Sequence, residues 1–101
     1  MTPIDPALQR LVSDTAAAEE SIPLDLYLPS GRLYGQTTSA ADFGRWVAAL
    51  LGQESAYTGT VEVEPDPEYV HLVVQPLSLG EESSEEIVRV RLSNVIAWTV
   101  G

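Results

Sequence analysis

The chain contains no cysteine and no lysine, and it has only one histidine among its 101 residues. Without cysteine, neither a disulfide framework nor a thiolate metal site can form. A single histidine cannot build a multi-histidine metal centre, and the HExxH and GxSxG motifs are both missing. No glycine-rich loop ends in Lys and Ser or Thr, as a phosphate loop would require. We therefore expect a non-enzymatic protein with no catalytic residues, no metal and no cofactor.

Long hydrophobic runs are also missing. No stretch of about 18 apolar residues is present, so we expect no membrane span. The first ten residues lack the charged-then-apolar leader of a secretory signal, which makes the cytoplasm the expected location. A length of 101 residues and an apolar content of 45% are typical of one globular domain. We expect that domain to cover residues 1–101.

Basic residues are scarce, because fifteen acids face only five arginines and the net charge is -10. Such a charge repels phosphate backbones and makes nucleic acid an unfavourable partner. Nine of the acids fall within residues 53–88, which contain no arginine. Two interpretations stay open: a solvated surface, suited to solubility or high salt, and an acidic face that meets a basic protein. In the second, the contact loop contains Glu81, Glu82, Glu85 and Glu86.

Two segments have the pattern of amphipathic helices. The first covers about residues 5–19, where Asp5 suits the N-cap and Pro6 the first helical position. The second covers about residues 39–51, with Ser39 as N-cap, Asp42 three residues later, and Gly52 as C-cap. Its apolar residues recur at helical spacing and predict a core-facing stripe: Phe43, Trp46, Val47, Leu50 and Leu51.

Short segments of alternating polarity predict strands. Residues 22–28 and 32–38 form a hairpin around the turn at residues 29–31, and Gly35 predicts a bulge or a sharp bend. Further short strands are expected at residues 60–64, 69–75, 87–92 and 95–100. His71 falls on the outward face of its strand and reads as a surface histidine. The predicted fold class is α+β, mainly β with two helices: a small, strongly bent antiparallel sheet or an SH3-like or Sm-like barrel. The barrel covers residues 22–101, with the second helix inserted after the first hairpin.

The segment SIPLDLYLPSGRLYGQTTS (residues 21–39) resembles the opening hairpin of the Sm-like (Lsm/Hfq-type) family of small β-barrels. RVRLSNVIAWTVG (residues 89–101) resembles the closing pair of strands in that family, joined by a short turn at Ser93 and Asn94. The resemblance covers about half the chain. It implies rings in which the last two strands pair between subunits. The loop that holds RNA bases in the family is replaced here by the helix 39–51, in which Asp42 is expected to act as a cap.

These observations favour a self-associating protein-interaction module whose partner is a second copy of the chain. An apolar final strand is a template for pairing with another chain, and the expected oligomer strands carry Val90, Leu92, Val95, Ile96 and Trp98. One alternative is an RNA-binding Sm-like protein, in which Arg32, Arg89 and Arg91 contact RNA. Another is an acidic inhibitor or immunity-type protein that binds a basic partner.

Overall fold

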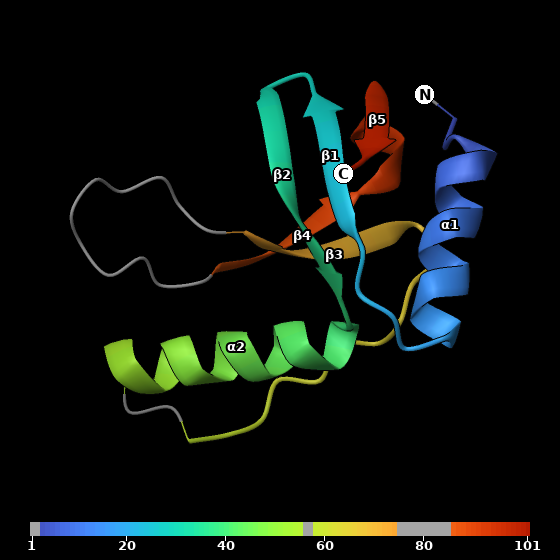
Figure 1. Ribbon diagram of the computed structural model, residues 1–101. Coiled ribbons are helices and arrows are strands. Elements are labelled where there is room, and N and C mark those ends of the chain that lie inside the picture. Colours follow the sequence, from blue (N-terminus) through green and yellow to red (C-terminus); the bar gives the residue numbers. More distant parts are fainter. Residues whose placement is uncertain (1–2, 56–57, 75–85) are drawn as a thin grey trace.

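A computed structural model of the chain describes residues 3–55, 58–74 and 86–101. In chain order the elements are α1 (Pro6–Ala17), β1 (Pro23–Leu28), β2 (Gly31–Thr38), α2 (Ala40–Glu54), β3 (Tyr69–Val74), β4 (Glu86–Arg91), a 3-10 helix (Leu92–Asn94) and β5 (Ala97–Val100) (Figure 1). Neither of these helices is long and apolar enough to cross a membrane.

The strands of the described part form one antiparallel sheet in the order β4-β3-β2-β1-β5 (Figure 1). This confirms the predicted α+β class. Within the described residues the sheet is not closed, because β4 pairs only with β3 and β5 pairs only with β1. Of the two predicted forms, the open sheet is therefore the one observed.

Helix α1 begins where the sequence predicts. The Asp5 side chain accepts a hydrogen bond from the Ala7 amide at 2.9 Å, and Pro6 occupies the first turn. The helix ends at Ala17, two residues before the predicted end, and Glu19 then takes a left-handed conformation with φ of 55°. The Glu20 amide donates back to the Thr15 carbonyl at 2.9 Å, which completes a Schellman-type end.

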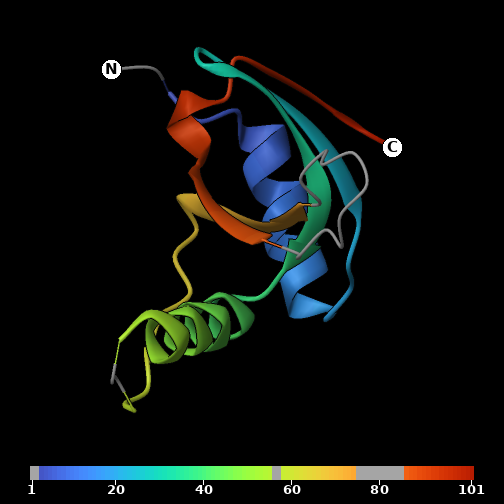
Figure 2. The ribbon, with the colours of Figure 1, turned by 90° about the vertical axis from the view of Figure 1, so that its left-hand side faces the viewer.

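The main core lies between α1 and the concave face of the sheet (Figure 2). The predicted alternation of apolar residues in the strands is confirmed, since the alternate side chains of β1, β3 and β4 reach this core. The buried members of the cluster are Leu8, Leu24, Leu26, Val70, Leu72, Val74, Val90 and Leu92.

Gly35 causes no bulge, since β1 and β2 pair residue for residue from Leu28 opposite Gly31 to Pro23 opposite Gln36. Its role is close approach: a Cβ atom at Gly35 would lie 2.5 Å from the carbonyl oxygen of Val73 on β3. Immediately after this position β2 begins to pair with β3 (Figure 2).

Helix α2 is capped by Ser39 as predicted, because the Ser39 hydroxyl accepts from the Asp42 amide at 3.0 Å. The predicted C-cap at Gly52 is wrong, since the helix continues to Glu54 and is capped by Ser55. The predicted strand at residues 60–64 is also wrong. Val61 and Val63 instead lie against α2, where Gly44 leaves room for the Val61 carbonyl. Alternating valines bury equally well against a helix, which is why the pattern misled.

The aromatic stripe of α2 does not join the main core. Phe43 lies 5.2 Å, centroid to centroid, from His71 and 6.2 Å from Trp46, and both aromatic side chains are only half-buried. Within the described residues, no residue of α2 belongs to the core cluster. The prediction of Trp46 as a core residue is therefore wrong. His71 points away from Val70 and Leu72, so α2 covers the opposite face of the sheet from α1.

Candidate functional site

Within the described residues β4 pairs with one strand, β3, and some of its backbone groups point away from that neighbour. The Leu92 amide donates to the Glu68 carbonyl at 2.8 Å, which makes these residues a hydrogen-bonded pair. Because such pairs alternate along an antiparallel ladder, Ile87, Arg89 and Arg91 belong to the other set. Their backbone N–H and C=O groups face outward from the sheet.

The other edge strand, β5, shows the same arrangement. The Gly101 amide donates to the Pro23 carbonyl at 3.2 Å, in register with the β1–β5 ladder. The alternation then turns the backbone groups of Trp98 and Val100 outward. Val100 is also an exposed apolar side chain. The described part of the sheet thus ends in two strands that could each accept a further strand.

The apolar side chains predicted for the oligomer strands mostly face inward. Val90 and Leu92 belong to the buried core, and Val95 and Trp98 pack against it. Ile96 is the exception, since 70% of this residue is exposed. What β4 and β5 offer to another chain is therefore mainly backbone hydrogen bonding, with Ile96 and Val100 as apolar additions.

The arginines predicted as RNA contacts are not gathered on one strand. Arg89 and Arg91 are both exposed on β4, where the Arg89 guanidinium lies 4.2 Å from the centre of the Tyr69 ring. Arg32 lies on β2 beside the hairpin turn and forms an ion pair with Asp25. One strand, β3, lies between β4 and β2, and Arg32 is at the hairpin end of β2, beyond the residues that pair with β3. These three described arginines therefore form no continuous basic surface.

The Asp25 and Arg32 pair was missed by the sequence reasoning, although diagonal neighbours in a hairpin can reach one another. The Arg32 Nε donates to both carboxylate oxygens of Asp25, at 2.8 and 2.9 Å. The Arg32 guanidinium covers Asp25, which lies on the outer face of the sheet and is only 3% exposed. The hydrogen bonds from Arg32 lower the pKa of Asp25 and raise that of Arg32.

Most of the predicted acidic contact loop lies outside the described residues: Glu81, Glu82 and Glu85. Glu86 is described, as the exposed first residue of β4 opposite Val74. Among the described residues, no group of three or more histidine, cysteine or acidic side chains is placed to hold a metal ion.

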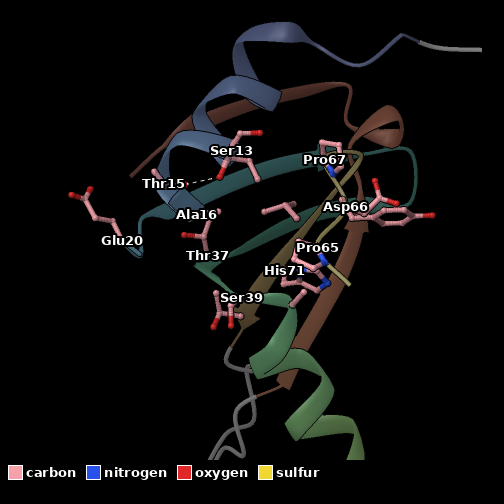
Figure 3. A pocket seen from close by; sticks show the side chains of 15 residues that line it. Ser13, Thr15, Ala16, Glu20, Thr37, Ser39, Pro65, Asp66, Pro67 and His71 are labelled. Carbon is pink, nitrogen blue, oxygen red and sulfur yellow. Dashed lines mark hydrogen bonds between the residues drawn. The ribbon is translucent and has the colours of Figure 1, made fainter. Parts of the chain in front are cut away.

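A pocket of about 310 Å³ lies where α1, the start of α2, β3 and the segment 65–67 meet (Figure 3). Its walls include Val12, Ala16, Pro65 and Val70. Among the described residues that line it, Glu20 and Asp66 are the ones that carry a charge at pH 7. No sequence signal brings these segments together. Residues 65–67 have the composition of a turn, and nothing local to them indicates contact with α1.

His71 also lines this pocket, and the prediction of a surface histidine is wrong. The residue does lie on the outer face of β3, but α2 covers that face, and only 5% of the residue is exposed. Its buried Nε2 atom has no hydrogen-bond partner among the residues that the structure describes. Burial and the nearby charge of Arg89 lower the pKa of His71 to about 4, so the ring is neutral at pH 7.

Comparison with known proteins finds no family model, no curated protein and no solved structure that matches this chain.

Proposed function

We propose that this chain is a non-enzymatic protein-interaction module that associates with copies of itself through β4 and β5. The supporting observation is that the described sheet ends in two strands with outward-facing backbone groups. Unpaired edges of this kind are templates for another strand. The resemblance to Sm-like proteins favours the same conclusion, since it implies pairing of the last two strands between subunits.

Pairing β4 of one copy with β5 of the next is a head-to-tail contact, because the two surfaces differ. A contact of this type repeats from copy to copy and ends only when the rotation closes a ring. Each junction extends the sheet by a ladder and brings exposed Ile96 and Val100 toward the neighbouring copy. The net charge of -10 per chain opposes association, so salt should favour it by screening the repulsion.

Proline at Arg91 tests the β4 edge without disturbing the ladder to β3. Arg91 has φ of -77°, which a proline ring can adopt, and its amide hydrogen points outward. Arg91→Pro therefore removes one edge donor, and the matched control Arg91→Gln removes the charge but keeps the donor. On β5 the corresponding pair is Val100→Pro and Val100→Ala.

The readout is the mass of each variant by light scattering on a sizing column, with circular dichroism to verify folding. The proposal predicts oligomers for wild type, Arg91→Gln and Val100→Ala, and a shift to smaller species for both proline variants. An unchanged mass in both folded proline variants would contradict assembly through these edges. A steep loss of mass in Arg91→Gln alone would point to a charge contact instead of strand pairing.

A further inference from the structure

The edge strand β4 carries two exposed arginines that differ from the other three in the chain. Arg89 and Arg91 form no ion pair with any carboxylate that the structure describes. The remaining arginines are each paired with an aspartate: Arg10 with Asp14, Arg32 with Asp25 and Arg45 with Asp42. In a chain of net charge -10, the β4 edge is therefore a local exception of positive charge.

Both guanidinium groups lie on the same face of the sheet. Arg89 and Arg91 are opposite His71 and Tyr69 on β3, and alternation places all four side chains on the outer face. The Arg89 guanidinium lies 4.2 Å from the centre of the Tyr69 ring, a cation–π contact that holds it beside the sheet. Glu86, the acid at the start of β4, falls on the other face by the same alternation.

The backbone of the same residues faces the same edge. The N–H and C=O groups of Ile87, Arg89 and Arg91 point away from β3. In an antiparallel ladder, residues that exchange hydrogen bonds lie about 5.5 Å apart at Cα, with side chains on one face. A strand added here would therefore place alternate side chains directly beside the two arginines, where opposite charges attract. The edge strand β5 (Ala97–Val100) offers backbone groups but no charged side chain.

From these observations we infer that the β4 edge binds an acidic peptide segment of another protein, which adds to the sheet as an extended antiparallel strand. The matching segment has two acids separated by one residue, opposite Arg91 and Arg89, and an apolar residue two positions later, opposite Ile87. A nucleic acid fits less well, because phosphate oxygens have no hydrogen to donate to the outward carbonyls. The inference does not rest on self-association, but a neighbouring copy would compete for the same edge.

Three heptapeptides test the inference: TETETVT, TQTQTVT and TEETTVT. The third has the composition and charge of the first, but its two acids point to opposite faces of a strand. Each carries a fluorophore, and its anisotropy is followed as the full-length chain is added. A salt concentration of about 0.15 M gives a screening length of about 8 Å and limits repulsion from distant acids.

The peptide TETETVT should bind roughly tenfold more tightly than TQTQTVT and roughly threefold more tightly than TEETTVT, as expected for two and one cross-strand charge pairs. Equal binding of TETETVT and TEETTVT would overturn the inference, because general attraction does not depend on the spacing of the acids. Binding of heptauridylate that requires Arg89, without binding of TETETVT, would identify a nucleic-acid surface and would also overturn it.

Variants of the chain locate the site. Arg89→Gln should weaken TETETVT by roughly threefold, which is typical of losing one exposed ion pair. Arg10→Gln removes the same charge from an exposed position of α1 and should leave binding unchanged. Equal effects of these two variants would contradict a site on β4.

The contribution of the backbone is measured at Arg91. Arg91→Pro removes the outward amide as well as the charge, so it should weaken TETETVT more than Arg91→Gln does. Equal weakening by the two folded variants would contradict strand addition.

A titration of Val100→Pro separates this inference from self-association, because that variant weakens the β5 edge and leaves β4 unchanged. Binding of TETETVT to folded Val100→Pro, whether equal to that of wild type or tighter, would support the inference. Absence of binding to both chains would overturn it, while the mass of the wild-type chain would still report self-association independently.

Discussion

One carboxylate, that of Asp5, joins the first helix to the last strand through Trp98. Its Oδ1 accepts the Ala7 amide at 2.9 Å and caps α1, while its Oδ2 accepts the Trp98 indole N–H at 2.9 Å. The two residues are 93 positions apart in the chain. The hydrogen bond from Trp98, followed by that from Ala7, lowers the pKa of Asp5 below 3.8.

We expect Asp5→Ala to lower the melting temperature by several degrees, because it removes both the helix cap and the link to β5. Trp98→Phe should lower the melting temperature less than Asp5→Ala does, since it keeps an aromatic ring and loses only the indole donor. Because the pKa of Asp5 is lower in the folded chain than the unfolded value of 3.8, its carboxylate stabilises the fold at pH values above 3.8. This stabilisation is lost as the pH falls through the folded pKa. Asp5→Asn should therefore show a shallower loss of stability below pH 3.8 than wild type in acid titrations. Identical acid titrations would contradict the assigned bond.

Glu19 takes the left-handed conformation that glycine adopts without steric cost. We expect Glu19→Gly to raise the free energy of unfolding by about 0.5–1 kcal/mol, measured by urea denaturation. Glu20→Gly removes the same charge at a residue without a positive φ, and it should not stabilise the chain. Equal gains from the two substitutions would attribute the effect to charge instead of backbone strain.

Alanine at Gly44 should destabilise the chain despite its better helix propensity. The new Cβ would lie 2.3 Å from the Val61 carbonyl oxygen, so the segment that carries Val61 must move off α2. Gly52 is an exposed position of the same helix, and Gly52→Ala should gain up to about 1 kcal/mol. Thermal melts of the two variants should shift in opposite directions. Parallel shifts would contradict the close approach of residues 61–63 to the helix.

The burial of neutral His71 should make the fold acid-sensitive. Its folded pKa of about 4 lies below the ordinary histidine value of 6.5, so the unfolded chain binds a proton first as the pH falls. Stability should therefore decline from about pH 6.5 to pH 4, by about 1–3 kcal/mol from this residue. His71→Phe removes the titrating group and the unpaired Nε2 while keeping a ring beside Phe43. Its unfolding free energy should change less over this range than that of wild type. A decline as steep as that of wild type would show that other groups dominate.

The features predicted correctly from the sequence are those set by neighbours along the chain. Asp5 and Ser39 cap their helices because an N-cap acts on amides two or three residues away. Leu24, Leu26 and Leu72 are buried because alternation in a strand assigns their side chains to one face.

The features missed depend on which element covers which face. Local patterns predicted His71 to lie on the surface, whereas α2 covers it. They predicted the stripe around Trp46 to lie in the core, whereas Trp46 is only half-buried. The pocket depends on the same information, because its walls come together only once α1 and the segment 65–67 are packed against each other. The periodicity of one segment does not indicate which other segment packs against it.

The most direct test of self-association is the absolute mass of the wild-type chain in solution. Light scattering on a sizing column would be recorded at low and high salt, since screening of the net charge of -10 should favour assembly. Strand pairing between copies predicts a discrete mass of several 10.9 kDa subunits, maintained or increased at high salt. A mass of 10.9 kDa at both salt concentrations and at high protein concentration would contradict it.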